Sequence, residues 1–103
     1  MGKSDSAKWL PAPGVRSVYT QDGAVLFDIN KGLCYSLDPV AAQIWVTIEG
    51  NQVGITLEGI VDALETHFPI PRQRLESDTA NWLNKLQLLG LVDQPIGQIV
   101  APT

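Results

Sequence analysis

The feature that most constrains this chain is a run of three short strand-like segments that leads directly into a helix start. Residues 15–20 (VRSVYT) alternate between apolar and polar side chains, as a half-buried strand does. Residues 24–29 and 33–37 are rich in strand-forming residues, and short glycine-containing turns separate the three segments. The pattern predicts a three-stranded antiparallel meander in which the last strand, Leu33–Leu37, has a neighbour on one side only.

Three helices are expected after the meander. Asp38-Pro39 is typical of a helix start, because Asp caps the first free N–H groups and proline at the first helical position loses no hydrogen bond. This helix is predicted to end at Glu49-Gly50. A second is expected from the N-cap Thr56 to Pro69-Ile70-Pro71, and a third over residues 72–89, closed by Gly90 in a left-handed conformation. The order of elements predicts an α+β, winged helix-turn-helix-like fold, in which a three-stranded antiparallel sheet is followed by three helices.

Both ends of the chain are expected to lie outside this domain. Residues 1–14 are broken by proline and glycine and are predicted to be a flexible arm, in which Trp9-Leu10 can still pack onto the domain. Residues 93–103 are predicted to be a flexible tail. The folded domain is therefore expected to cover residues 15–92, and 103 residues suffice for one compact core but not for two.

Charge and hydropathy exclude several classes of partner. The formal net charge of −4 gives no electrostatic reason to bind nucleic acid or an anionic membrane, and it weakly favours a basic peptide. No apolar run approaches the roughly 20 residues that a membrane span needs. The N-terminus also lacks the apolar stretch of a signal peptide, so the chain is expected to be cytoplasmic.

The residue pattern gives no support for catalysis. Cys34 and His67 are the single cysteine and histidine, and the expected elements hold them apart. Cys34 is interpreted as a small buried thiol, and His67 as a structural or solvated histidine near a helix end. One cysteine and one histidine cannot assemble a usual zinc site, and no glycine-rich phosphate-binding loop is present. We therefore expect no enzyme activity, no metal and no cofactor.

A small DNA-binding regulator is one alternative, because the topology is of the helix-turn-helix type. The third expected helix carries Arg72, Arg74 and several amide side chains, which suit base edges and phosphates. Glu76 and Asp78 lie among them and would repel phosphate. These carboxylates count against DNA binding.

Peptide binding has a positive physical case. If Leu33–Leu37 is an exposed sheet edge, its unpaired N–H and C=O groups can accept an extended peptide as a fourth strand. On the third helix, a stripe beside the core stripe could form the floor of a groove next to that edge; it consists of Asp78, Trp82, Lys85 and Leu89. Trp82 lies at the boundary of the two stripes, where an indole suits the anchoring of an apolar side chain. The alternative interpretation is that Trp82 belongs to the core.

A set of turns and core positions, in this order and spacing, resembles the PqqD-like family. The matching residues are Gly23-Ala24-Val25-Leu26-Phe27-Asp28, Gly32-x-x-Tyr35-x-Leu37-Asp38-Pro39, Ile44-Trp45, Ile60-Val61-x-x-Leu64, Asp78, Trp82-Leu83, Leu86 and Gly90-Leu91-Val92. Members of this family are precursor-peptide recognition elements of ribosomally made, modified peptides. Within the family, the chain is most similar to the stand-alone leader-binding proteins of lasso peptide biosynthesis. The resemblance implies a non-catalytic peptide chaperone that presents a precursor's leader segment to a leader peptidase, to a cyclase, or to both.

The resemblance also implies the binding residues. In the family, the leader adds to the third strand of the meander and packs against the third helix. Carried onto this sequence, the peptide-binding residues are Leu33, Cys34, Tyr35, Ser36 and Leu37 on the strand and Asp78, Trp82, Lys85, Leu86 and Leu89 on the helix. An alternative with the same fold is the chaperone of the pyrroloquinoline quinone precursor peptide, which hands its peptide to a radical S-adenosylmethionine enzyme.

Overall fold

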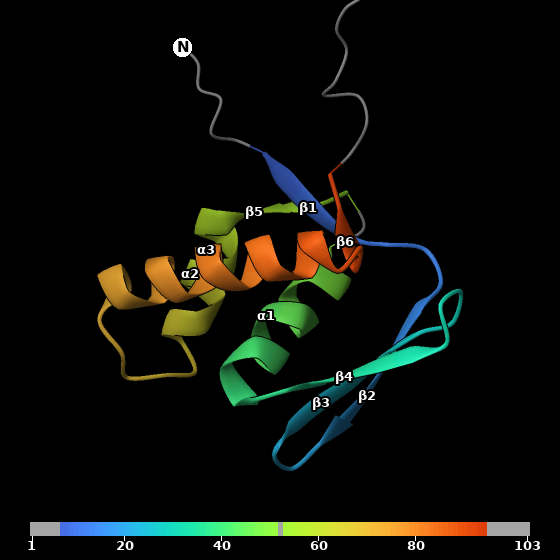
Figure 1. The fold of residues 1–103 in the computed structure, drawn as a ribbon. Helices are drawn as coiled ribbons and strands as arrows, with labels where there is room; N and C mark the ends of the chain where they lie inside the picture. The colour runs from blue at the N-terminus through green and yellow to red at the C-terminus, as the bar shows by residue number, and fades with distance from the viewer. Residues whose placement is uncertain (1–6, 52, 95–103) are drawn as a thin grey trace, which may run out of the picture.

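The expected meander forms an antiparallel sheet in the computed structural model, which describes residues 7–51 and 53–94 (Figure 1). Its strands are β2 (Val15–Thr20), β3 (Gly23–Asp28) and β4 (Leu33–Leu37), in the order β2-β3-β4. Leu26 of the central strand pairs with Ser17 on one side and with Tyr35 on the other. The prediction that β4 is an edge strand of this sheet is therefore confirmed.

Three helices follow, as predicted: α1 (Pro39–Glu49), α2 (Leu57–Glu65) and α3 (Arg72–Leu88). The carboxylate of Asp38 accepts a hydrogen bond from the Ala41 N–H at 2.8 Å, and the Thr56 hydroxyl accepts one from the Gly59 N–H at 3.1 Å. Both caps satisfy N–H groups that have no partner within the helix. Gly90 follows α3 with a φ of 76°, the left-handed conformation expected of it.

A second small sheet lies outside what the sequence patterns predict. In it, β1 (Lys8–Pro11) pairs antiparallel with β5 (Ile55–Thr56) and with β6 (Val92–Asp93), in the order β5-β1-β6. The prediction of an arm without regular structure is therefore wrong for residues 8–11, and the prediction of an unstructured tail is wrong for Asp93. Proline is compatible with this strand because Pro11 is its last residue, and the next N–H, of Ala12, donates to the Leu91 carbonyl at 2.9 Å. Within the expected arm and tail, residues 1–6 and 95–103 lie outside the described residues.

Helix α1 occupies the centre of the domain, since it contacts β3, α2 and α3 (Figure 1). Its buried residues are Ala41, Ala42, Ile44, Trp45 and Ile48, and Leu26 of β3 is also buried. This core fixes α3 on one side of α1 and the β2-β3-β4 sheet on another. Among the described residues, no helix is long and apolar enough to span a membrane.

Candidate functional site

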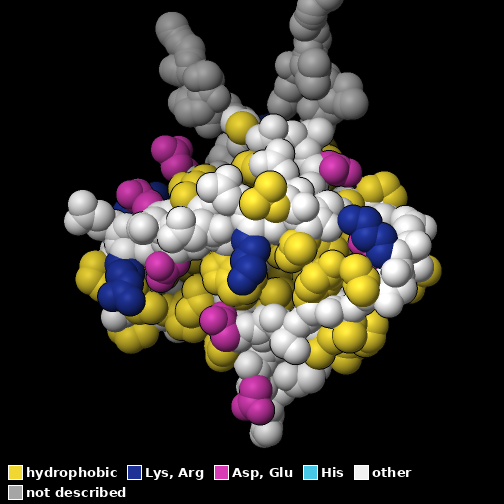
Figure 2. All heavy atoms as spheres, in the orientation of Figure 1, with side chains coloured by type: hydrophobic (Ala, Val, Ile, Leu, Met, Phe, Trp, Pro, Cys, Tyr) yellow, Lys and Arg dark blue, Asp and Glu magenta, His cyan; other side chains and the backbone are white. Residues whose placement is uncertain are grey.

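A shallow groove runs between the edge strand β4 and helix α3. Its volume is about 290 Å³, and its lining residues are Cys34, Tyr35, Ser36 and Leu37 on β4, Trp82, Lys85, Leu86 and Leu89 on α3, and Leu91 just beyond the helix. Figure 2 shows hydrophobic side chains gathered between α3 and the sheet, with a basic side chain among them. The structure thus brings together all of the predicted site residues except Leu33 and Asp78.

Leu33 and Asp78 flank opposite ends of the groove. Leu33, at the start of β4, lines an adjoining hollow with Phe27 and Ile29. Asp78 lines a different hollow together with Trp82. Its Oδ2 atom lies 3.8 Å from Nε of Arg74. The two residues are therefore neighbours of the groove and not part of its lining.

Side chains of β4 alternate between two environments. Tyr35 pairs with the buried Leu26 and Leu37 pairs with the buried Ala24, so these two side chains are on the side of the sheet that faces the helices. Cys34 and Ser36 alternate to the other face. The interpretation of Cys34 as a buried thiol is wrong, because its side chain is exposed on the outer face of the sheet.

Trp82 lies at the boundary between core and groove, as its place between the two helical stripes predicts. Its indole is half-buried and packs against the core cluster, while its remaining surface lines the groove and the two hollows beside it. The ammonium group of Lys85 lies 4.9 Å from the centroid of the ring. One part of the indole therefore belongs to the core, and another part faces the groove.

Two residues near the C-terminal end of α3 lie outside the predicted helical stripes. Leu91 is fully buried and lines the groove, and its N–H donates to the Leu86 carbonyl at 2.9 Å. Its membership in the Gly90-Leu91-Val92 motif is the sequence signal that points to it. Lys31, in the turn before β4, donates from Nζ to the Leu89 carbonyl at 3.3 Å, where a cation also complements the negative end of the helix dipole. This contact joins the β3–β4 turn to the end of α3.

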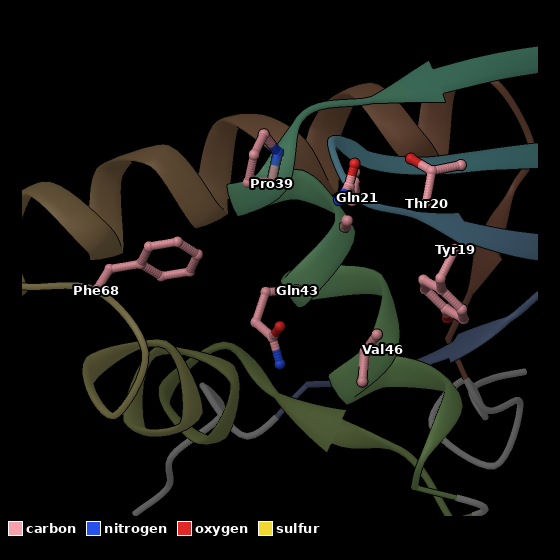
Figure 3. Close-up of a pocket in the computed structure, with 9 residues that line it drawn as sticks. Tyr19, Thr20, Gln21, Pro39, Gln43, Val46 and Phe68 are labelled. Atoms are coloured by element: carbon pink, nitrogen blue, oxygen red, sulfur yellow. The ribbon is translucent and has the colours of Figure 1, made fainter.

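A second hollow, of about 370 Å³, lies beside α1, and its lining side chains include Tyr19, Gln43, Val46 and Phe68 (Figure 3). The Tyr19 hydroxyl donates a hydrogen bond to the Glu49 carboxylate. Burial, together with this hydrogen bond, raises the pKa of Tyr19 to about 12. The hydrogen bond ties β2 to the end of α1, which is a structural role, and none of the predicted site residues lies in this hollow.

The arginines at the start of α3 face carboxylates of the same chain. Arg72 lies 2.8 Å from Asp62, 2.8 Å from Glu65 and 3.2 Å from Glu76. Basic groups that are already paired are poorly available to phosphate. Within the part of the chain that the structure describes, no group of three or more His, Cys, Asp or Glu residues could hold a metal ion.

The fold and the groove define a small α+β domain in which an open strand edge lies beside a partly apolar helix. The family model described as "Coenzyme PQQ synthesis protein D (PqqD)" matches residues 23–92. The chain therefore belongs to the PqqD family, which confirms the resemblance noted in the sequence and agrees with the expectation of a non-catalytic binding domain.

Two solved structures are similar to this chain, whereas no curated protein matches it. The first is "TbiB1 in Complex with the TbiA(beta) Leader Peptide", at 28% identity and a TM-score of 0.70, covering 82% of this chain and 94% of that one. The second is "Lasso peptide synthetase B1 complexed with the leader peptide", at 23% identity and a TM-score of 0.69, covering 84% of this chain and 99% of that one. At the lower identity, the second likeness concerns the fold alone.

Proposed function

We propose that this chain binds the leader segment of a ribosomally made precursor peptide as an additional strand on β4. The observation that carries the proposal is the groove between the β4 edge and the half-buried Trp82, in a chain of the PqqD family. The likeness to TbiB1, whose structure contains a leader peptide, supports this class of ligand. Strand addition supplies main-chain hydrogen bonds, and alternate side chains of the peptide then face α3.

The energetics of strand addition show why the helix is needed. A strand of about five residues forms about four or five hydrogen bonds, each with a net value of ~1 kcal/mol. Ordering those residues costs ~1–2 kcal/mol apiece, so backbone pairing alone is close to neutral. Affinity must come from peptide side chains that are buried in the groove, at ~1.5–3 kcal/mol each. The expected ligand is a short flexible segment with two or three spaced apolar or aromatic anchors.

The proposed contacts divide between the two elements. On β4, the backbone of Leu33–Leu37 sets the register of the bound strand. On α3, the side chains of Asp78, Trp82, Lys85, Leu86 and Leu89 determine which peptide side chains fit. We interpret α2, the turn over residues 66–71 and α3, together with the β2-β3-β4 sheet, as a winged helix-turn-helix-like arrangement that serves peptide binding. We also infer that the recognition domain begins at β1 and ends at β6, because these strands pair with each other and contact α1 and α3.

We infer that the bound leader is presented to a separate leader peptidase, to a macrolactam-forming cyclase, or to both, in a lasso peptide pathway. The likeness to TbiB1 supports this assignment. The description of the family model favours a second candidate, the precursor peptide of pyrroloquinoline quinone, which would be handed to a radical S-adenosylmethionine enzyme. The neighbouring genes distinguish the two, because a transglutaminase-like peptidase with an asparagine-synthetase-like cyclase indicates the first and a radical enzyme the second.

Calorimetry and NMR with synthetic leaders test the proposal. The probes are the leader of a precursor encoded beside this gene and the TbiA(beta) leader. We expect the first to bind at micromolar strength or better and to shift the amide signals of residues 33–37 and of α3. No measurable heat and no shift with either probe would reject the proposed function.

A further inference from the structure

The groove has a local charge that opposes the charge of the whole chain. Although the formal net charge is −4, Lys85 is the one charged residue among those described that lines the groove. Arg72 and Arg74 on the same helix lie within 4 Å of carboxylates, whereas no salt bridge among the described residues includes Lys85. Figure 2 shows basic side chains next to the hydrophobic surface between α3 and the sheet. A ligand in this groove therefore meets one cation and no carboxylate in the lining, whereas Asp38 and Asp78 line the adjoining hollow beyond Trp82.

Lys85 is placed directly beside the proposed anchor site. Its Nζ lies 4.9 Å from the Trp82 ring centroid, in a cation–π geometry, so the ammonium group is near the apolar wall. A bound peptide would exclude water from this wall and so strengthen the interaction of the ammonium group with any nearby charge. The side chain is otherwise exposed and can turn towards a ligand.

A second cation lies at the same end of α3. Lys31 Nζ is 3.3 Å from the carbonyl of Leu89, which is one helical turn beyond Lys85. The carboxylate of Asp28, the last residue of β3, is buried and accepts a hydrogen bond from the backbone N–H of Lys31 at 3.2 Å. Asp28 lines the adjoining hollow that contains Leu33 and does not line the groove. The two lysines therefore form a basic rim along the last turns of α3.

We propose that the groove selects peptides in which an acidic side chain lies next to the apolar anchor that covers Trp82. Lys85 recognises this side chain, and Lys31 adds to the attraction at the end of the groove. The inference rests on the proposed function and deepens it, because it specifies the charge of the ligand. It also reverses the weak preference for a basic peptide that the net charge predicts. Salt screens the interaction of a peptide with distant charges, so a charged group within a few ångströms of the peptide has the larger effect.

Selection from a random library tests this preference and does not require the precursor to be identified. The probe is a displayed library of random twelve-residue peptides, selected in parallel on the unaltered chain, on Lys85→Glu and on Lys8→Glu. Lys8 lies on β1, in the other sheet, and its reversal changes the total charge by the same amount. We expect Asp or Glu to be enriched at a fixed distance from an apolar residue with the unaltered chain and with Lys8→Glu. With Lys85→Glu, the enrichment should disappear or change to Lys and Arg.

Binding of one selected peptide and of its acid-to-amide variant then gives the size of the effect. Loss of the carboxylate should weaken binding about two- to fivefold to the unaltered chain and not at all to Lys85→Glu, and higher salt should shrink the difference. Enriched apolar anchors without acidic residues, or an acidic preference that Lys85→Glu leaves unchanged, would overturn the inference while leaving the proposed function intact. Selected peptides that leave the amide signals of β4 unshifted, or a library without binders, would contradict both.

Discussion

Replacement of Trp82 by alanine is expected to weaken peptide binding in a domain that stays folded. A buried tryptophan typically removes about 150–250 Å² from water. Because no more than about a third of the Trp82 side chain is exposed in the free chain, roughly 50 Å² of indole surface remains for the peptide to cover. At ~25 cal/mol per Å², this surface contributes ~1.3 kcal/mol, and alanine retains a small part of it. We therefore expect a loss of about 1 kcal/mol, which is roughly a fivefold rise in Kd.

The fold should survive this change because the core stripe of α3, with Leu75, Thr79, Leu83 and Leu86, stays in place. Leu88→Ala is the matched control. Leu88 is on the same helix and 87% exposed, and it does not line the groove, so its removal should leave Kd unchanged. Calorimetry with the cognate leader, after circular dichroism has shown both variants to be folded, makes the comparison. A folded Trp82→Ala that binds as tightly as the unaltered chain would assign the indole to the core alone.

Three further outcomes follow from the same geometry. Cys34 is the only cysteine and is exposed on β4, so saturating leader peptide should slow its reaction with a maleimide at least severalfold; an unchanged rate would place the peptide elsewhere. Burial, together with the hydrogen bond to Glu49, raises the pKa of Tyr19 from an ordinary 10 to about 12, so the neutral phenol stabilises the fold fully below pH 10 and this stability is lost as the pH rises from 10 to 12. Denaturant titrations should show a steeper alkaline loss of stability for the unaltered chain than for Tyr19→Phe, and parallel curves would contradict the pKa shift. Gly23→Ala should cost about 3 kcal/mol or more in stability, because its Cβ would lie 1.9 Å from the Leu37 carbonyl oxygen, whereas Gly32→Ala meets no atom within 4 Å and should cost only about 1–2 kcal/mol; equal losses would contradict this packing.

The elements that the sequence predicts well are those determined by neighbouring residues. Asp38-Pro39 and Thr56 define helix starts through hydrogen bonds to N–H groups three residues ahead, and these are visible in any local window. The alternation of residues 15–20 and the glycine turns likewise fix the meander and its edge strand. For this reason, most of the lining of the groove can be predicted from the sequence.

The features that escaped prediction depend on residues far apart in the chain. β1 exists because Trp9 pairs with Ile55 and Leu10 pairs with Asp93, and neither partner carries a strong strand pattern of its own. The contact of Lys31 with the end of α3 is of the same kind. The exposure of Cys34 could not be predicted because it depends on which face of the meander the helices cover. The alternation of side chains along a strand shows that Cys34 and Tyr35 point to opposite faces. Only the packing of the sheet against α1 shows which of the two faces is buried.

Amide hydrogen exchange on β4 tests the central claim most directly. In an edge strand, every second residue directs its N–H away from the sheet, so in the free chain these amides of residues 33–37 should exchange quickly. With saturating leader peptide, we expect the same alternate amides to become protected while the amides of β2, the other edge of the sheet, keep their rates. Protection confined to β2, or no change on β4 in the presence of a peptide that binds, would contradict strand addition at this edge.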